Sequence, residues 1–345
     1  MKAVVKYGCE DGQVELREVP EPRIGPRDVL LEMAAAGVCG SDVEQWRHHV
    51  SYPVNVPVIQ GHEFCGVVRE VGQEVTGFKA GDRAVSETAA YICGQCRLCL
   101  TGEYNLCPRR LGFGYGLDGA FTRYVRVPAR CLHRIPDNVS FEEAALTEPA
   151  CVVYNAVHVK SRLRPGEPVV VIGPGPIGLF AVQMCRASGA GAILLVGTAA
   201  DRTRLAVGRE VGATAVVDAS ESDPMEAVRD LIGEEGAPLV IDAAGPSAAV
   251  RLAMDAVARN GQITKIAWGP KPLDLSLDPL VGKAATLQGS YSHTWRTWEA
   301  VLAMIAAGAL QMAPMITHRF TIAEWSRAYH LVESREAVKV VLSPA

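Results

Sequence analysis

A strand that runs directly into a glycine-rich turn and then into a helix is the feature that most constrains this fold. Residues 169–172 are all β-branched and apolar, as in a strand buried on both faces of a parallel sheet. The sequence Gly-Pro-Gly-Pro-Ile-Gly follows directly, and an apolar helical pattern follows that. In G-x-G-x-x-G turns, the glycines allow the tight turn, the close approach of backbone to a pyrophosphate, and the packing of helix on strand. The turn therefore predicts a dinucleotide site that includes Gly173, Gly175, Pro176, Ile177 and Gly178.

The segments around this turn indicate two domains, as a length of 345 residues also suggests. Strand-like and helix-like segments alternate up to about residue 267, which is typical of a doubly wound parallel α/β (Rossmann) sheet. The first half instead has short apolar runs such as Val29–Met33, separated by Gly, Pro and Asp clusters, which indicates a β-rich domain. We expect the β-rich domain to contain residues 1–152 and 291–345, and the dinucleotide-binding domain to contain residues 153–290.

The end of the second strand of this sheet bears on which dinucleotide is bound. An acidic residue there normally holds the 2′-hydroxyl of NAD. Here small residues follow the strand, and Thr198, Arg202 and Arg204 stand nearby. A small-residue opening beside an arginine suits a 2′-phosphate, so the sequence favours NADP over NAD. Asp201 leaves the alternative open, because it either caps the next helix or reaches the ribose.

Four cysteines are crowded into one short polar loop. In a cytosol that keeps thiols reduced, such a cluster points to metal binding before disulfides. Four thiolates fill the tetrahedral shell of a zinc ion and leave no open position. We therefore expect a structural zinc site, with an iron–sulfur cluster as the weaker alternative. Its ligands would be Cys93, Cys96, Cys99 and Cys107.

A catalytic zinc needs fewer protein ligands and one position left for water or substrate. Cys39 and the pair His62-Glu63 both stand in glycine-rich turns and are candidates. Taken singly, Cys39 fits a buried core thiol and His62 fits a structural histidine. The pair does not begin the H-E-x-x-H motif of zinc proteases, because Gly66 occupies the position of the second histidine.

Together these motifs resemble the zinc-containing medium-chain dehydrogenase family, over nearly the whole chain. The resemblance implies a β-rich GroES-like catalytic domain beside the Rossmann sheet, with Cys39 and His62 bound to a catalytic zinc. The sequence Thr-Glu-Pro around Glu148 is similar to the sorbitol (polyol) dehydrogenase branch, where Glu148 would be the ligand-side carboxylate. Glu63 would then be either a direct ligand or a neighbour linked through water. The matching segments are Gly37–Asp42, Gly61–Glu63, Gly81–Arg83, the four-cysteine loop, Asp118–Phe121 and Gly173–Gly178.

The resemblance also implies an activity, namely hydride transfer between a secondary alcohol, such as a polyol or sugar alcohol, and NAD(P). Ser41 corresponds to the hydroxyl that takes the proton of the substrate. Many relatives have a histidine three residues later, whereas this chain has Glu44, and a carboxylate can also accept a proton. His48 and His49 are an alternative exit for that proton. The rival functions are amino-alcohol oxidation of the threonine 3-dehydrogenase type and a non-catalytic zinc- and nucleotide-binding protein.

Composition argues against two classes of partner. The net charge of −4 gives no reason to expect nucleic acid or an anionic membrane surface. The chain starts without a secretory signal, and its most apolar stretch is interrupted by glycine and proline. We therefore expect a cytoplasmic protein that acts on a small alcohol, polyol or ketone and forms a homodimer or homotetramer.

Overall fold

The computed structural model describes residues 1–269 and 271–344 and divides into two compact units. Unit 1 comprises Met1–Glu148, Thr294–Ala306 and Ile316–Ala345, and unit 2 comprises Pro149–His293 and Ala307–Met315. The predicted domains include Pro270 and Ala345, which lie outside the described residues. They also place residues 307–315 with the β-rich domain, whereas the structure groups this segment with unit 2. The reason is local packing, since Gln311 and Gln183 exchange two hydrogen bonds of 2.6 and 3.2 Å.

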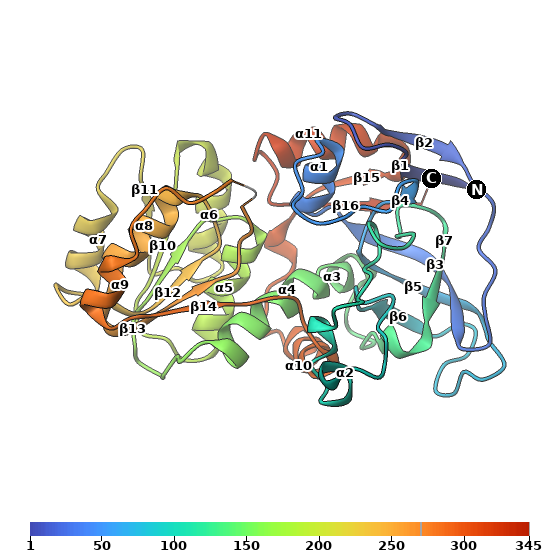
Figure 1. Cartoon of the computed structure of the whole chain (residues 1–345), viewed down its shortest axis with the longest axis horizontal. Helices are drawn as coiled ribbons and strands as arrows, with labels where there is room; N and C mark the ends of the chain where they lie inside the picture. The colour runs from blue at the N-terminus through green and yellow to red at the C-terminus, as the bar shows by residue number, and fades with distance from the viewer. Residues whose placement is uncertain (270, 345) are drawn as a thin grey trace. The chain divides into compact units, whose positions relative to one another are not determined.

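Unit 2 is built on one parallel sheet with helices packed against it (Figure 1). Its strands are β9 (Val169–Ile172), β10 (Ile193–Gly197), β11 (Ala215–Asp218), β12 (Ala237–Asp242), β13 (Val257–Lys265) and β14 (Thr286–Gly289). Its helical segments are η3 (Asn155–Lys160), α5 (Pro176–Ala187), η4 (Ala199–Asp201), α6 (Arg202–Glu210), α7 (Pro224–Leu231), α8 (Ser247–Ala256), α9 (Asp278–Lys283) and η5 (Ala313–Met315).

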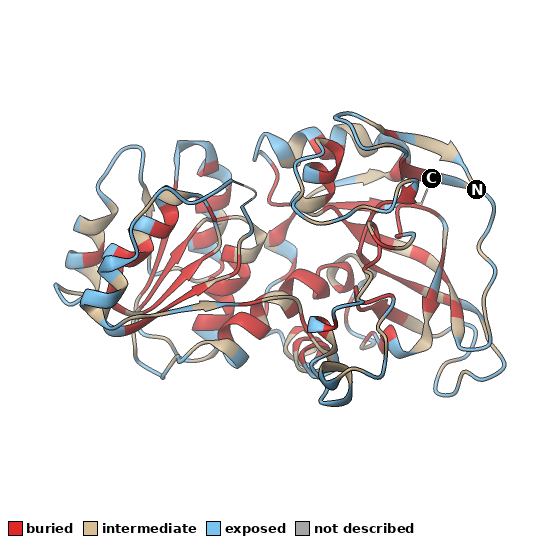
Figure 2. Cartoon of the chain, in the orientation of Figure 1, coloured by how far each residue is buried: buried red, intermediate tan, exposed pale blue. Residues whose placement is uncertain are grey.

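The strand order of this sheet is β11-β10-β9-β12-β13-β14, with every pair parallel. This is the 3-2-1-4-5-6 order of dinucleotide-binding folds, in which the order reverses between the first and fourth strands. The four residues of β9 are at most 4% exposed, and Figure 2 shows the central strands of this sheet buried. The doubly wound parallel sheet predicted from the sequence is therefore confirmed.

Unit 1 is rich in β-structure. Its strands are β1 (Lys2–Lys6), β2 (Val14–Glu18), β3 (Asp28–Gly37), β4 (Val58–Ile59), β5 (Glu63–Val71), β6 (Arg83–Ser86), β7 (Tyr124–Pro128), β8 (Leu132–Arg134), β15 (Ile316–Thr321) and β16 (Lys339–Ser343). Its helical segments are α1 (Gly40–Trp46), α2 (Arg97–Leu100), η1 (Tyr104–Leu106), η2 (Ala129–Cys131), α3 (Phe141–Ala145), α10 (Trp295–Ala306), η6 (Ile322–Glu324) and α11 (Trp325–Glu333). Helix α4 (Thr147–Tyr154) crosses from unit 1 into unit 2.

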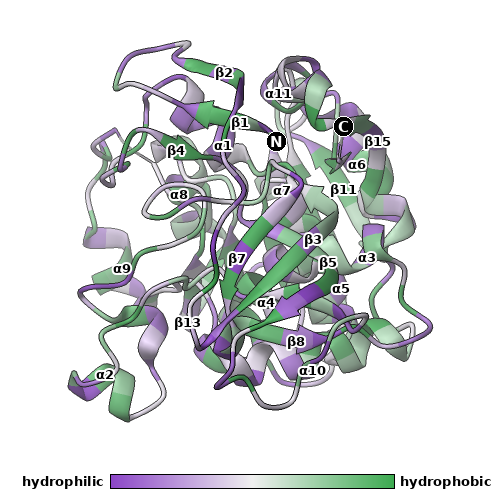
Figure 3. Cartoon of the chain, turned by 90° about the vertical axis from the view of Figure 1, so that its right-hand side faces the viewer, coloured by the Kyte–Doolittle hydropathy of each residue, from purple (hydrophilic) through white to green (hydrophobic). Residues whose placement is uncertain are grey.

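The larger sheet of unit 1 follows the order β15-β16-β3-β5-β6-β8, with β7 paired to β3. Figure 3 shows hydrophobic stretches along β3 and β7, and residues of both strands enter the main core with Phe64, Phe113 and Phe121. The C-terminal strand β16 lies next to β3, where Val341 pairs with Gly37. This pairing brings the end of the chain to the end of β3. Among the described residues, no helix is both long and apolar enough to cross a lipid bilayer.

Candidate metal and cofactor sites

The pairing of β3 with β5 brings Cys39 and His62 together. Gly37, the last residue of β3, pairs with Glu63, the first residue of β5, so the turns that carry Cys39 and His62 are adjacent. Ligand atoms of Cys39, His62 and Glu63 all lie within 4.8 Å of one another. Sulfur, imidazole and carboxylate ligands at such separations fit a tetrahedral zinc ion.

Asp42 orients His62, and the sequence analysis did not identify it. Its Oδ2 accepts a hydrogen bond from the Cys39 N–H at 2.9 Å, as an acidic third residue of a helix does in a capping box. Its Oδ1 lies 3.4 Å from His62 Nδ1, which leaves Nε2 for the cluster, as in carboxylate–histidine–zinc arrangements. The acid within Gly-Ser-Asp at the start of a helix was the signal available in the sequence.

The electrostatics of this cluster favour a cation beside His62. Burial lowers the pKa of His62, but Asp42 and Cys39 outweigh burial and raise it well above its ordinary value. Thr147 Oγ1 is buried without a hydrogen-bond partner, and Asp42 Oδ1 and His62 Nδ1 are buried with no polar contact beyond the 3.4 Å between them. Buried polar atoms are normally satisfied, so their gathering around a Cys–His–Glu cluster fits a site that a metal ion completes.

Glu63 is held by a buried lysine from β16. The Nζ of Lys339 lies 2.6 Å from Oε1 and 2.5 Å from Oε2 of Glu63. The Lys339 side chain is 2% exposed and the Glu63 side chain is fully buried. Burial lowers the pKa of Lys339, but Glu63 and Cys39 outweigh burial and raise it, so Lys339 carries a positive charge. The sequence did not identify Lys339, because 276 residues separate it from Glu63.

Glu148 lies near the three-residue cluster but is not part of its tight group. It is 8% exposed and stands at the start of α4. Burial raises the pKa of Glu63, Lys339 lowers it, and Glu148 adds a further upward contribution. Glu148 is therefore close enough for its charge to act on Glu63. The described structure brings Cys39, His62 and Glu63 into ligand range of one another, with Glu148 as the next carboxylate.

Ser41 and Glu44 both lie on α1, directly after Cys39, but in different surroundings. Ser41 is half-buried. The Glu44 side chain is 55% exposed, and its Oε2 lies 3.8 Å from Nδ1 of the exposed His49. Glu44 therefore belongs to a surface pair with His49, which is one of the two histidines considered as an alternative proton exit.

The four-cysteine loop forms the second cluster. Ligand atoms of Cys93, Cys96, Cys99 and Cys107 lie within 4.8 Å of one another. Backbone N–H groups of Cys93 and Cys96 donate to the sulfurs of Cys107 and Cys93, each at 3.4 Å. Backbone N–H groups of Gln95 and Cys96 lower the pKa of Cys93 to about 6, which favours the thiolate that metal binding requires. Four converging sulfurs with backbone donors fit a closed structural zinc site.

The glycine turn has the shape that a pyrophosphate needs. Gly173 has a φ of +97°, and a Cβ on Gly178 would lie 1.8 Å from the carbonyl oxygen of Gly173. At Gly175 a Cβ would meet nothing within 4 Å, so the missing side chain leaves open space beside the backbone. Helix α5 begins directly afterwards, at Pro176 and Ile177, and its N-terminal N–H groups and dipole suit an anion.

In the loop after β10, the side chain of Asp201 makes its hydrogen bonds within the loop itself. Its Oδ2 accepts hydrogen bonds from the N–H and the hydroxyl of Thr198, at 3.1 and 2.8 Å. Its Oδ1 lies 3.7 Å from Arg204, whose side chain is 11% exposed. Arg202 is 78% exposed and lies 3.5 Å from Glu221. The acid of this loop is thus used as a cap, and the exposed group is the guanidinium of Arg202.

Comparison with known proteins places this geometry in a family. The model for the alcohol dehydrogenase GroES-like domain matches residues 25–137, and that for the zinc-binding dehydrogenase domain matches residues 176–307. The chain is 38% identical to a sorbitol dehydrogenase of Halalkalibacterium halodurans, over 100% of this chain and 99% of that protein. It is 34% identical to an L-threonine 3-dehydrogenase of Bacillus licheniformis, with the same coverage of the two chains.

A solved structure resembles the whole chain. It is a protein of Sinorhizobium meliloti, provisionally assigned as a zinc-binding dehydrogenase and crystallised with NADP. The TM-score is 0.90 at 30% identity, over 99% of each chain. The predicted resemblance to the zinc-containing dehydrogenases, including the polyol dehydrogenase branch, is therefore confirmed. The chain belongs to the zinc-binding alcohol dehydrogenase family, with a GroES-like domain, a Rossmann domain, and a dependence on zinc and a nicotinamide cofactor.

Proposed function

We propose that this protein oxidises a secondary alcohol group of a polyol or sugar alcohol, and reduces the matching ketone, with NADP as the preferred cofactor. The observation that carries the proposal is the open cluster of Cys39, His62 and Glu63, separate from the closed four-cysteine loop. A scaffold without catalysis would have no use for an open metal site. A sequence identity of 38% with a sorbitol dehydrogenase, over the full chain, supports this substrate class.

We assign the residues of the open site as follows. Cys39, His62 and Glu63 would hold a catalytic zinc, because their ligand atoms lie within range of one ion. Glu148 would be the further carboxylate on the ligand side, and Lys339 balances the charge of Glu63. A bound zinc supplies Lewis acidity that lowers the pKa of a substrate hydroxyl, and the nicotinamide accepts the hydride. The Ser41 hydroxyl accepts the proton from the substrate hydroxyl and passes it to solvent. Glu44 on α1 and its exposed neighbour His49, which follows the helix, would relay that proton to solvent.

Substrate profiling with both cofactors tests the proposed function. We expect turnover of sorbitol, xylitol or 2,3-butanediol to exceed that of L-threonine by at least about tenfold in kcat/KM, a difference of about 1.4 kcal/mol in transition-state binding. The threonine 3-dehydrogenase relative makes threonine the second candidate. A preference for L-threonine would replace the polyol assignment, and no turnover of any alcohol by zinc-loaded protein would favour the non-catalytic alternative.

The preference for NADP is proposed from the loop after β10. Asp201 is occupied by Thr198 and Arg204, which leaves the exposed Arg202 to meet a 2′-phosphate. Thr198 supplies a further polar group, and Arg204 would reach the phosphate only by leaving Asp201.

Replacing Arg202 by alanine should therefore lower kcat/KM with NADP by about 10- to 100-fold, because a charge-assisted hydrogen bond contributes about 1.5–3 kcal/mol. The value with NAD should stay within about twofold of the parent. Arg209→Ala, in the last turn of the same helix, is the matched control. Equal losses with both cofactors in Arg202→Ala would contradict a 2′-phosphate contact.

We also propose that two copies of the chain form a homodimer through β14. This dimer would be either the complete assembly or one half of a homotetramer. Within the described sheet, β14 is the edge strand next to β13, and such an edge can extend into a second copy. Hydrophobic side chains accompany it, since Val281 is 80% exposed and Leu287 is 42% exposed. The cytoplasmic location expected from the sequence stays a prediction.

Replacing Val281 and Leu287 together by lysine is expected to yield a monomer, because two charges would be buried at the new interface. Light scattering coupled to size-exclusion chromatography measures this. Val159→Lys, at an exposed apolar position of η3, should leave the mass unchanged. A double variant with the mass of the parent would show that copies associate elsewhere.

A further inference from the structure

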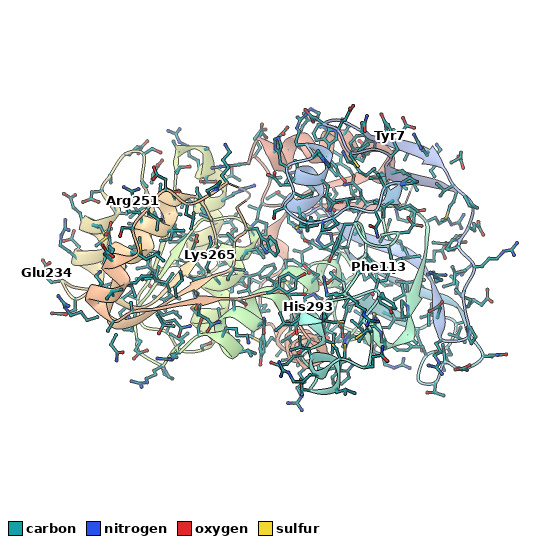
Figure 4. All side chains as sticks on the ribbon, in the orientation of Figure 1. Tyr7, Phe113, Glu234, Arg251, Lys265 and His293 are labelled. Carbon is teal, nitrogen blue, oxygen red and sulfur yellow. The ribbon has the colours of Figure 1, made fainter. Side chains whose placement is uncertain are left out.

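Unit 2 contains an ion pair that the proposed chemistry does not use. Asp242 and Lys265 are the last residues of β12 and β13, and they lie side by side in the register of this parallel pair. The Nζ of Lys265 lies 2.7 Å from Oδ2 of Asp242. The Asp242 side chain is 1% exposed and the Lys265 side chain 24%. Figure 4 labels Lys265 among the strands of this sheet.

The pair fixes the turn of residues 242–245, which follows β12. Oδ1 of Asp242 accepts hydrogen bonds from the N–H groups of Ala244 at 3.0 Å and Gly245 at 2.8 Å. The ammonium of Lys265 also donates to the carbonyl oxygen of Gly245, at 3.3 Å. Gly245 has a φ of +96°, a conformation that glycine adopts without strain. Lys265 therefore both balances the charge of the cap and holds the far end of the turn.

This turn packs directly on the glycine turn that is expected to bind the pyrophosphate. The N–H of Ala243 donates to the carbonyl oxygen of Ile172 at 2.9 Å. A Cβ on Gly173 would lie 2.9 Å from backbone atoms of Ala243 and Ala244, so the two turns are in close contact. The dinucleotide crosses the carboxyl edge of such a sheet, with its adenylate half on the side of the second strand. The turn of residues 242–245 is on the other side, where the nicotinamide half extends.

We propose that Lys265 is a positioning residue for the cofactor, acting through Asp242 to hold the turn of residues 242–245 against the nicotinamide half. This inference rests on the proposed cofactor site but not on the substrate or on the choice between NADP and NAD. Its consequence is selective: loss of Lys265 should weaken binding of the whole dinucleotide without weakening binding of its adenylate half.

The test is equilibrium binding of cofactors and fragments to zinc-loaded protein, measured by fluorescence and by calorimetry. The probes are NADPH and NADH, with adenosine 2′,5′-bisphosphate and 5′-AMP as the matching adenylate fragments. In Lys265→Met we expect the Kd of the preferred reduced dinucleotide to rise about tenfold or more, and that of its fragment to stay within about twofold. An unchanged Kd for the dinucleotide, or an equal rise for dinucleotide and fragment, would overturn the proposal.

Two further variants separate positioning from folding and from direct contact. Lys283 donates to three backbone carbonyls, those of Met254, Asp255 and Val257, at 2.7–2.9 Å near the start of β13. Lys283→Met should therefore leave both Kd values unchanged.

The double variant Lys265→Met with Asp242→Asn keeps an Oδ1 acceptor without a buried charge, and should regain most of the lost affinity. Persistent loss in this double variant would mean that Lys265 does not act through Asp242, which would overturn the proposal. A parent that binds neither dinucleotide would instead overturn the proposed cofactor site, and the inference with it.

Discussion

Replacing Cys39 by serine is expected to lower kcat/KM for the alcohol substrate by about a thousandfold or more. The thiolate of Cys39 belongs to the cluster with His62 and Glu63, and a serine hydroxyl is a poor substitute for a thiolate zinc ligand. Losing the Lewis acid removes several kcal/mol of transition-state stabilisation, and each 1.4 kcal/mol corresponds to a factor of about ten in rate.

The control for this variant is Cys9→Ser, because Cys9 is an exposed thiol that belongs to neither cysteine-containing cluster. It should retain the activity and metal content of the parent. Cofactor binding should also survive in Cys39→Ser, because the glycine turn lies in unit 2. A Cys39→Ser protein that keeps full activity would exclude Cys39 as a ligand of the catalytic metal.

Replacing Lys339 by methionine is expected to lower the free energy of unfolding of unit 1 by about 3–5 kcal/mol, the usual cost of leaving a buried charge without its partner. Both side chains of the pair are at most 2% exposed, so water cannot replace the ammonium beside Glu63. The free energy of unfolding is measured by urea denaturation of zinc-loaded protein, with tryptophan fluorescence as the signal.

Two comparisons make the Lys339 result interpretable. Arg319→Met breaks an exposed pair with Glu142, in which the side chains are 56% and 43% exposed, and should cost less than about 1 kcal/mol. Lys339→Met combined with Glu63→Gln removes both charges and should regain a large part of the lost stability. A Lys339→Met protein as stable as the parent would mean that Glu63 does not depend on this lysine for its charge balance.

The parts of the fold that could be predicted from the sequence are those determined by residues close together in the chain. The strand, glycine turn and helix at Val169–Ala187 are contiguous, so their chemistry and geometry could be inferred together. The same holds for Cys93–Cys107, where spacing alone brings the four sulfurs within range of one ion. The alternation of apolar segments after the turn was enough to predict the parallel sheet.

The supporting residues could not be predicted, because their partners are distant in the sequence or use an ordinary residue type. In the sequence, Lys339 is an ordinary lysine. Only the pairing of β16 with β3 places it beside Glu63. Lys265 acquires its role only from the register that places it next to Asp242. The grouping of residues 307–315 with unit 2 could not be inferred from the sequence either, because the hydrogen bonds from Gln311 to Gln183 span 128 residues.

The zinc content of the freshly purified parent, of His62→Ala and of Cys96→Ser tests the central claim most directly. His62 belongs to the open cluster and Cys96 to the closed one. The account predicts about two zinc ions per chain in the parent and about one in each variant, with alcohol oxidation lost in His62→Ala. About one zinc ion in the parent, retained in His62→Ala and lost only in Cys96→Ser, would contradict it, because the four-cysteine loop would then be the only metal site.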